Sequence, residues 1–229
     1  IPAVELGRVV AVEAVRRVAE RASRATLPTR VIVATDDPRI AEAVRSFGGE
    51  VVMTPAELPS GTDRIAYVAR QLPDAEIIVN VQGDEPLIAP EMIDEAIRPL
   101  VGDRAVQVGT LVKPITDRAE IANPAVVKVA VNVRGDALYF SRSPIPYVRD
   151  GEKAAYLKHV GLYVFRREFL LQYASWEESG LEQSEKLEQL RILYHGHKIK
   201  TTVTLHDSIP IDTAEDAERV RKILEKKSP

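Results

Sequence analysis

The chain has 229 residues, of which 45% are hydrophobic and 28% are charged, as expected of a globular protein with enough apolar side chains for a sizeable core. Its 31 basic and 34 acidic residues give a net charge of −3, so no general attraction to nucleic acid is expected, and no apolar run is long enough to cross a membrane. The sequence has no cysteine, which excludes disulfides, thiolate zinc sites and cysteine nucleophiles and is typical of a reducing compartment.

Short apolar strands and amphipathic helices alternate over the first hundred residues. The predicted elements are, in order, a helix over 9–25, a strand over 31–34, a helix begun by Asp37 and Pro38 and ended by Gly48-Gly49, a strand over 51–53, a helix begun by Ser60, a strand over 77–81 and a helix begun by Pro90. Strands separated by helices indicate βαβ units with right-handed crossovers. We therefore expect an α/β fold with a doubly wound, mainly parallel sheet.

The middle of the chain changes to an antiparallel pattern. Strands are predicted over 126–133 and 137–140, joined by an Arg134-Gly135-Asp136 turn, with a further strand over 157–165. The rest is predicted as helices over 167–176 and 184–195, a strand over 198–205, and a last helix opened by a capping box of Thr213 and Asp216. Because no long Pro/Gly/Ser-rich linker interrupts the chain, residues 1–229 are expected to form one domain, with an antiparallel lobe inserted at about 123–165.

Polar clusters follow three of the predicted strands, at 35–37, 82–86 and 212–213. In an open parallel sheet, ligands bind beyond the carboxyl ends of the strands. Helix capping alone accounts for Asp37 and Thr213, whereas Asp84 follows a strand and a flexible glycine and is not an obvious cap. Asp84 and Asp212 are therefore a candidate pair for Mg²⁺, which usually takes one or two carboxylates together with substrate phosphates.

Other polar residues each have a structural alternative. Ser60 and Gly61 could offer backbone N–H groups to an anion or a base edge, or Ser60 could simply form a capping box with Asp63. Arg142, which follows a strand, could bind a carboxylate or phosphate, or form a surface ion pair. A lone strand histidine such as His159 is more often structural than functional.

Taken in order, these segments resemble one family, the 3-deoxy-manno-octulosonate (Kdo) cytidylyltransferases, also called CMP-Kdo synthetases. The runs that carry the resemblance are VIVATD at 31–36, PSGTDR at 59–64, VQGDEP at 81–86, NP at 123–124, VKV at 127–129, YFSRSPIPY at 139–147, KHVG at 158–161, LEQLR at 187–191 and IDT at 211–213. They span roughly residues 30–225, and the runs at 139–147 and 187–191 are the most specific.

The resemblance implies a Rossmann-like nucleotidyltransferase fold and a reaction in which CTP and Kdo give CMP-Kdo and diphosphate, for lipopolysaccharide biosynthesis. It implies that Asp84 and Asp212 are the catalytic pair and hold Mg²⁺. Such an ion polarises the α-phosphate and lowers the pKa of the attacking sugar hydroxyl. The other implied contacts are Ser60, Gly61, Arg64 and Gln82 with the nucleotide, and Arg142, His159, Tyr163, Glu188 and Gln189 with Kdo.

One part of the family pattern is absent. In the family the first strand leads into a basic, glycine-rich loop that wraps the triphosphate, in outline Arg-x-Gly-Ser-x-Arg-x-x-x-Lys-Pro-Leu. Here Ile1-Pro2-Ala3 resembles the end of that strand and Val4 resembles the start of the segment after the loop, so about ten residues are missing between them. We expect a mobile loop that the printed sequence omits, since such loops order on ligand binding. The alternative is a true deletion, which an intact mass near 25.3 kDa would favour.

Two other functions stay open at this point. One is a cytidylyltransferase acting on sialic acid or another sugar acid, against which the runs at 187–191 and 142–146 argue. The other is a non-catalytic protein that binds a nucleotide sugar, which a true loop deletion would favour. The resemblance also suggests a homodimer formed through the antiparallel insertion. A cytoplasmic location is expected from the absence of cysteine and of a signal segment and from where CTP is found.

Overall fold

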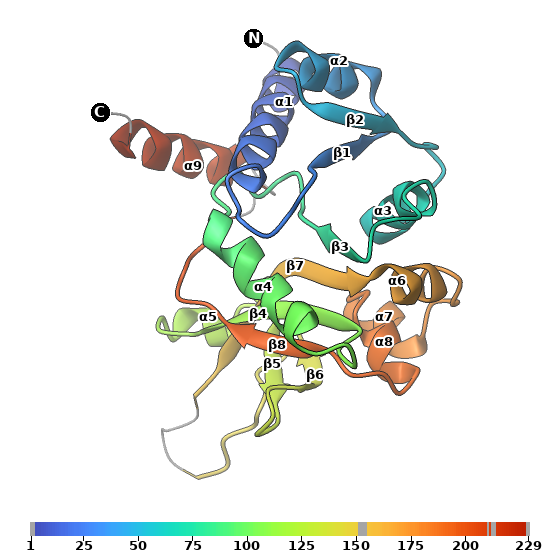
Figure 1. Ribbon diagram of the computed structural model, residues 1–229. Helices are drawn as coiled ribbons and strands as arrows, with labels where there is room; N and C mark the ends of the chain where they lie inside the picture. Colours follow the sequence, from blue (N-terminus) through green and yellow to red (C-terminus); the bar gives the residue numbers. More distant parts are fainter. Residues whose placement is uncertain (1–2, 151–154, 210, 212–213, 228–229) are drawn as a thin grey trace. The chain divides into compact units, whose positions relative to one another are not determined.

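The computed structural model describes residues 3–150, 155–209, 211 and 214–227, and the chain divides into two compact units (Figure 1). Unit 1 comprises residues 1–73, 80–94 and 206–229, and unit 2 comprises residues 74–79 and 95–205. Each unit therefore combines segments that are distant in the sequence.

Unit 1 contains a small parallel sheet and several helices. Its elements are α1 (Ala3–Ala22), β1 (Ile32–Thr35), α2 (Pro38–Ser46), β2 (Glu50–Met53), α3 (Gly61–Arg70), the start of α4 (Pro90–Gly102) and α9 (Ala214–Lys227). β1 and β2 pair in parallel, from Ile32 opposite Glu50 to Thr35 opposite Met53. Ala41 and Val44 of α2 are almost completely buried, as the inward face of an amphipathic helix requires.

Side-chain caps begin α2 and α3. The Asp37 carboxylate accepts a hydrogen bond from the Arg39 backbone N–H at 2.9 Å, with Pro38 at the first helical position. The Ser60 hydroxyl accepts one from the Asp63 N–H at 3.2 Å. Each cap satisfies a backbone donor that has no partner inside the helix. Both predicted helix starts are confirmed.

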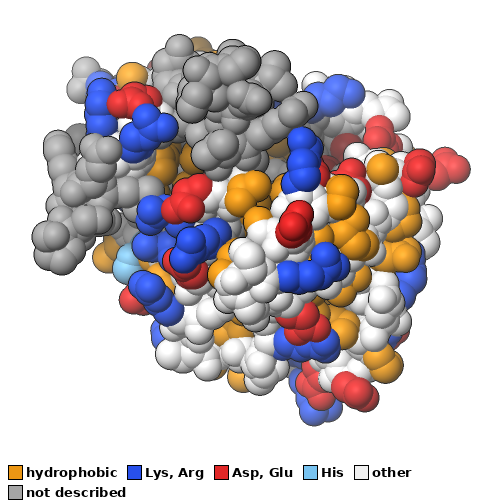
Figure 2. Space-filling view, turned by 90° about the horizontal axis from the view of Figure 1, so that it is seen from above, with side chains coloured by type: hydrophobic (Ala, Val, Ile, Leu, Met, Phe, Trp, Pro, Cys, Tyr) orange, Lys and Arg blue, Asp and Glu red, His pale blue; other side chains and the backbone are white. Residues whose placement is uncertain are grey.

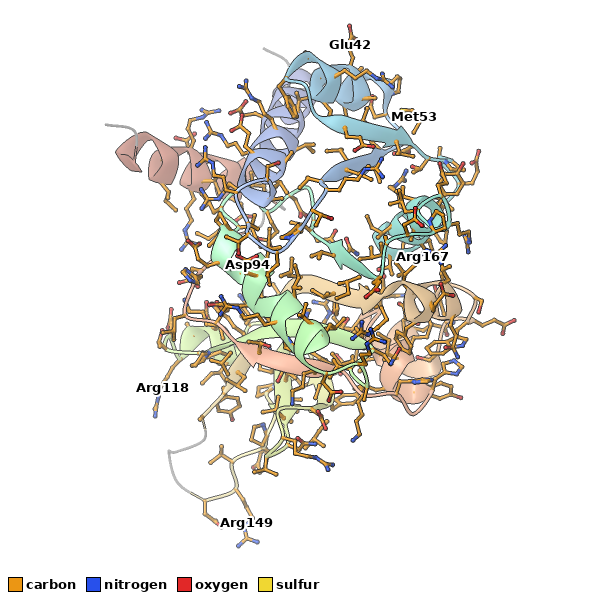
Figure 3. All side chains as sticks on the ribbon, in the orientation of Figure 1. Glu42, Met53, Asp94, Arg118, Arg149 and Arg167 are labelled. Carbon is orange, nitrogen blue, oxygen red and sulfur yellow. The ribbon has the colours of Figure 1, made fainter. Side chains whose placement is uncertain are left out.

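Asp94, near the start of α4 (Figure 3), anchors the turn that follows α1. Its carboxylate is 5% exposed and accepts the backbone N–H groups of Thr26 at 3.0 Å and Leu27 at 2.9 Å. The Thr26 hydroxyl donates a further bond at 2.7 Å. A buried carboxylate with several donors is stable as the anion, so Asp94 holds this turn against the first residues of α4.

Unit 2 is built on a mixed six-stranded sheet with the order β6-β5-β7-β4-β8, and β3 also pairs with β7. β4 lies antiparallel to β7 and parallel to β8, while β5 lies antiparallel to both β6 and β7. The elements are β3 (Ile77–Asn80), the rest of α4, β4 (Val108–Pro114), α5 (Ala119–Ala122), β5 (Lys128–Val131), β6 (Ala137–Ser141), β7 (Leu157–Arg166), α6 (Arg167–Tyr173), α7 (Gly180–Glu185), α8 (Leu190–Tyr194) and β8 (Lys200–Val203).

A β-bulge interrupts the pairing of β4 with β7. Thr110 lies opposite Tyr163, but the next residue, Leu111, lies opposite Val160, so two residues of β7 are accommodated between consecutive β4 partners. A bulge bends its strand and redirects the side chains that flank it. In this protein those side chains include two of the predicted sugar contacts.

The α/β class and the antiparallel insertion are confirmed. β5 and β6 form the predicted hairpin, and β7 matches the strand predicted over 157–165. The pairing of the early strands is less continuous than expected, because β1 and β2 form their own sheet while β3 pairs with β7. β4 itself was not predicted, although Val108, Leu111 and Val112 are completely buried in it.

The helix predicted over 184–195 was wrong. The structure has two short helices there, α7 and α8. Lys186, which ends α7, adopts a left-handed backbone with φ 52°, a conformation that stops a helix. The capping box predicted at Thr213 lies outside the described residues.

Charges are mixed by sign on the face shown in Figure 2, where Lys and Arg side chains are interspersed with Asp and Glu. This distribution agrees with the small net charge of −3. None of the helices in the described ranges is long and apolar enough to span a membrane.

The strongest ion pair described in unit 2 joins α7 to α8. Arg191 donates from Nε and Nη2 to the two carboxylate oxygens of Glu182, at 2.8 and 2.6 Å. Both side chains are more than nine-tenths buried, with exposures of 8% and 7%. The pair is bidentate and desolvated, so each charge depends on the other for stabilisation.

Replacing Arg191→Met should therefore lower the free energy of unfolding at neutral pH by about 3 kcal/mol, because the Glu182 charge stays buried without its partner. Urea denaturation measures the loss. The matched control is Arg16→Met, which breaks the exposed Arg16–Glu20 pair (51% and 42% exposed) and should cost no more than about 1 kcal/mol. Equal losses of unfolding free energy in the two variants would contradict the conclusion that the buried charges of Arg191 and Glu182 stabilise each other.

Candidate functional site

Arg64 lies where the loops after β1 and β2 meet α3 in unit 1. Its Nη1 is 3.2 Å from an Asp36 carboxylate oxygen and donates to the Thr54 hydroxyl. The Thr54 backbone N–H donates to the Thr35 carbonyl at 2.9 Å, which extends the β1–β2 pairing by one bond. The guanidinium thus lies at the carboxyl ends of the two parallel strands. An open α/β sheet binds its ligands at this edge.

Ser60, Gly61 and Gln82 are close to one another in unit 1. The Ser60 hydroxyl both caps α3 and donates to the Asp63 carboxylate at 2.8 Å, so the capping interpretation of Ser60 is what the structure shows. A side chain at exposed Gly61 would come within 3.6 Å of the Gln82 amide oxygen. The bare backbone of Gly61 therefore leaves room beside the Gln82 amide, which can both donate and accept hydrogen bonds.

Asn80 is a candidate that the sequence reasoning missed. It ends β3, is 3% exposed, and its amide nitrogen has no hydrogen-bond partner among the described residues. Its side-chain oxygen is 3.5 Å from the Gln82 amide nitrogen. A buried donor without a partner is costly, and such a donor is typical of a position that meets a ligand. The available signal was a polar residue closing an otherwise apolar strand.

Asp84 is exposed in the loop after β3. Its backbone carbonyl accepts a hydrogen bond from the Ile211 N–H at 2.9 Å, and Ser208 donates to the neighbouring Glu85. The segment leading to position 212 is therefore bound to the loop that carries Asp84, while Asp212 itself lies outside the described residues.

The donor chemistry at Asp84 suits Mg²⁺. An exposed carboxylate offers the hard oxygen ligand that Mg²⁺ prefers, and magnesium sites often take only one or two carboxylates, with water and substrate phosphates supplying the rest. The described residues contain no cluster of three or more side chains able to hold a metal. A site that relies on substrate oxygens is compatible with this arrangement.

Arg142, at the end of β6 in unit 2, binds main-chain carbonyls. Nε donates to the Glu185 carbonyl at 2.7 Å, Nη1 to that of Pro124 at 2.9 Å and Nη2 to that of Lys186 at 3.3 Å. In return the Glu185 carboxylate accepts the Arg142 backbone N–H at 2.9 Å and the Ser141 hydroxyl at 2.6 Å. The guanidinium is thus held by main-chain carbonyls and not by the surface ion pair considered as the structural alternative, and these bonds use three of its five N–H groups.

Lys128 is a buried residue that donates hydrogen bonds to the main chain around Arg142. Its side chain is completely buried, and Nζ donates to the carbonyls of Asn123 at 2.9 Å, Val126 at 2.6 Å and Arg142 at 2.5 Å. Burial lowers the pKa of Lys128, and the positive charge of Arg142 adds to this effect. Three carbonyls match the three ammonium hydrogens, so Lys128 fixes the residues around Arg142. No sequence pattern indicated this role.

His159 and Tyr163 lie side by side at the β7 bulge. Their ring centroids are 5.2 Å apart, and the His159 ring also meets Phe140 edge-on at 5.2 Å. Four residues of a regular strand span about 13 Å, so the bulge brings these two rings together. Desolvation in this aromatic setting lowers the pKa of His159 to about 3, which keeps the imidazole neutral at physiological pH.

Tyr163 lies beside His159, and its hydroxyl has a raised pKa. Burial raises the pKa of Tyr163 well above 10, with smaller contributions from Tyr173 and from the Glu188 carboxylate. Tyr173 in turn donates its hydroxyl to the Glu188 carbonyl at 3.1 Å. Tyr163 therefore stays protonated, as a neutral hydroxyl that can donate or accept a hydrogen bond.

Gln189 is the most buried of the predicted sugar contacts. It is 5% exposed, immediately precedes α8, and its amide nitrogen has no hydrogen-bond partner among the described residues. An amide donor buried in this way favours a ligand acceptor over solvent.

The predicted site residues thus fall into two groups. Unit 1 holds Ser60, Gly61, Arg64, Gln82 and Asp84, the nucleotide and metal candidates. Unit 2 holds Arg142, His159, Tyr163, Glu188 and Gln189, the sugar candidates. Arg142 binds the turn leading to Glu188, and the rings of His159 and Tyr163 pack together at the β7 bulge.

Comparison with known proteins gives consistent matches. Residues 14–199 match the cytidylyltransferase family. A 3-deoxy-manno-octulosonate cytidylyltransferase from Geobacter metallireducens is 50% identical, over 96% of this chain and 90% of that protein. One from Geobacter sulfurreducens is 52% identical, over 93% and 88%.

Solved structures agree with these matches. A CMP:2-keto-3-deoxy-manno-octonic acid synthetase complexed with CTP superposes with a TM-score of 0.89 at 45% identity, covering 93% of this chain and 88% of the other. A 4-diphosphocytidyl-2C-methyl-D-erythritol synthase from Anaerococcus prevotii, at 14% identity and a TM-score of 0.61, shares the fold alone. The resemblance stated from sequence motifs and the nucleotidyltransferase fold expected from it are confirmed.

Proposed function

Since the chain belongs to the cytidylyltransferase family, we propose that it transfers a cytidylyl group from CTP to Kdo, giving CMP-Kdo and diphosphate for lipopolysaccharide biosynthesis. The observation that carries this proposal is the set of polar residues that unit 2 brings into one compact unit, namely Arg142, His159, Tyr163, Glu188 and Gln189. Kdo is a sugar acid with one carboxylate and several hydroxyls, and this set combines a guanidinium, a neutral imidazole, a phenol, a carboxylate and a buried amide.

Each member of the set suits part of such a ligand. The two N–H groups that Arg142 does not use on carbonyls can bind a carboxylate. The Glu188 carboxylate can accept from sugar hydroxyls, and the buried Gln189 amide nitrogen can donate to one. The neutral His159 can accept a hydrogen bond from a sugar hydroxyl without introducing a charge.

Unit 1 offers complementary chemistry for the nucleotide. The Gln82 and Asn80 amides can read the donor and acceptor edge of a cytosine, and the open backbone at Gly61 permits close approach of a flat base. Arg64 adds a positive charge at the end of the parallel strands. We propose these residues as the nucleotide contacts.

In the reaction, the anomeric hydroxyl of Kdo forms a bond to the α-phosphorus while the bond from that phosphorus to the β-phosphate oxygen breaks, releasing diphosphate and one proton. The protein acts mainly by positioning the two substrates. Asp84 and Asp212 are the proposed ligands of Mg²⁺, which when bound neutralises phosphate charge and makes the sugar hydroxyl more acidic. We assign no proton transfer to His159, whose low pKa makes it a poor base.

We also propose that the protein is a homodimer that works in the cytoplasm. The dimer proposal rests on the resemblance and on β6, which forms an edge of the sheet and carries Leu138 with 60% of its surface exposed. Apolar groups on an open edge strand favour pairing with another chain. Light scattering should give about twice the chain mass of 25.3 kDa, and a monomer at micromolar concentration would contradict the dimer.

The function is tested by diphosphate release from CTP and Mg²⁺ with a panel of sugar acids. Kdo should support turnover, and sialic acid should give at least about a hundredfold lower kcat/KM. The hydroxyls of sialic acid are arranged differently, so buried polar groups of the site would be left unpaired. Turnover with sialic acid but not Kdo would replace the proposed substrate. Binding of CTP without any turnover, in protein of verified mass, would instead support a nucleotide-sugar-binding role and a true loop deletion.

Asp84→Asn should lower kcat by about a hundredfold or more, because the amide loses the negative charge that Mg²⁺ requires while keeping the shape of the side chain. Thermal unfolding should be unchanged. Asp74→Asn, an exposed aspartate outside the proposed site, is the control and should keep full activity. Near-normal turnover by Asp84→Asn at saturating Mg²⁺ would remove Asp84 from the metal site.

A further inference from the structure

Thr110 meets the β7 bulge with a completely buried hydroxyl. The residue is 1% exposed and lies in β4 at the position where the register shifts. Its Oγ1 is 2.7 Å from the Leu162 carbonyl oxygen, 3.3 Å from the Val160 carbonyl oxygen and 2.9 Å from Nε2 of His159. One side chain therefore contacts both the irregular backbone of the bulge and the imidazole beside it.

These three contacts determine which His159 nitrogen carries the proton. A threonine hydroxyl has one hydrogen, and carbonyl oxygens can only accept. Without that hydrogen between them, the Thr110 oxygen and the Leu162 carbonyl oxygen would be two acceptors only 2.7 Å apart, so the hydrogen points to Leu162. The remaining bond, between Thr110 and His159, must be donated by the ring, so Nε2 carries a hydrogen.

The other ring nitrogen is then a hydrogen-bond acceptor. A neutral imidazole has one N–H, so a ring protonated at Nε2 has a bare lone pair on Nδ1. The rings of Phe140 and Tyr163 pack edge-on and tilted against the imidazole. None of the described residues donates a hydrogen bond to Nδ1.

We propose that Thr110 is a positioning residue that fixes His159 as its Nε2–H tautomer and so makes Nδ1 an acceptor for a hydroxyl group of the sugar acid. This inference rests on the proposed function for the identity of the ligand, but not for the tautomer. The bulge contributes to this arrangement, because both carbonyls that Thr110 contacts belong to the irregular stretch of β7.

The proposal has a consequence for substrate choice. An acceptor held in a fixed position favours a hydroxyl, which can donate, over a hydrogen or a methoxy group at the same carbon, which cannot. Because the ring is flanked by aromatic side chains and cannot switch tautomer while Thr110 holds Nε2, the site has no simple way to adapt to such an analogue.

The test compares Thr110→Val with Thr110→Ser in the full-length protein. Valine keeps the shape but removes the hydroxyl, whereas serine keeps the hydroxyl. With ¹⁵N-labelled histidine at pH 7, the wild-type His159 should show a pyrrole-type Nε2 and a pyridine-type Nδ1, assigned by the loss of both signals in His159→Gln. Thr110→Ser should keep this pattern, and Thr110→Val should show a mixture of tautomers or the Nδ1–H form.

Kinetics supply the second readout. Thr110→Val should raise KM for Kdo by about tenfold, the value of one lost hydrogen bond, while KM for CTP stays unchanged and Thr110→Ser stays near wild type. A wild-type His159 protonated at Nδ1, a Thr110→Val spectrum like the wild type, or an unchanged KM for Kdo in Thr110→Val would each overturn the proposal.

The two readouts separate this proposal from the proposed function. The spectra are recorded without substrate, so they decide whether Thr110 sets the tautomer even if Kdo proves not to be the substrate. Failure of the wild-type protein to use Kdo, together with the expected spectra, would reject the proposed function and retain the tautomer assignment. A general folding defect would lower the signals of all histidines in Thr110→Val. The wild-type spectrum then decides, because a His159 ring protonated at Nδ1 would overturn the proposal without any variant.

Discussion

Unit 2, which holds the proposed sugar contacts, depends on one constraint, that every buried carbonyl must find a donor. Unit 2 contains a bulge, a hairpin and a left-handed residue at Lys186, and each breaks the regular pairing of the backbone. Side chains supply donors to this backbone: the buried Lys128 makes three hydrogen bonds, the half-buried Arg142 three and the buried Thr110 one to the bulge. Irregular backbone inside a protein is stable only when such partners exist.

The same donors hold the residues that we propose as ligand contacts. Lys128 binds the carbonyl of Arg142, Arg142 binds the turn before Glu188, and Thr110 binds the ring of His159. In unit 2 the same side chains therefore provide hydrogen-bond donors for main-chain carbonyls and orient the candidate site residues. A rigid supporting shell of this kind keeps catalytic and binding groups within the small tolerance that their chemistry allows.

Local sequence signals identified the elements that local physics determines. Asp37 and Ser60 were recognisable as caps because a cap needs only a side-chain oxygen next to the backbone it serves. The β5–β6 hairpin was recognisable from its turn. The sugar candidates came from the resemblance of whole motifs, and the structure brings them together in unit 2 although they span residues 142 to 189.

The features that sequence reasoning missed depend on contacts between distant segments. Lys128 and Thr110 look like ordinary strand residues, and only partners 14 to 52 positions away give them a role. Asn80 stands out only when burial is known, because an amide without a partner is unremarkable on a surface. β4 was missed because its apolar run could not be told from a buried helix segment by periodicity alone.

The way in which Arg142 is held bears on how this protein can change over evolutionary time. Its guanidinium rests on the main-chain oxygens at positions 124, 185 and 186, and a main-chain oxygen is present whichever amino acid occupies the position. Substitutions at 124 and 186 that preserve the backbone path leave this grip intact, whereas at 185 the carboxylate also holds Ser141 and the Arg142 N–H. The position of Arg142, a proposed sugar contact, is thus insensitive to substitution at two of its three supports and sensitive at the third.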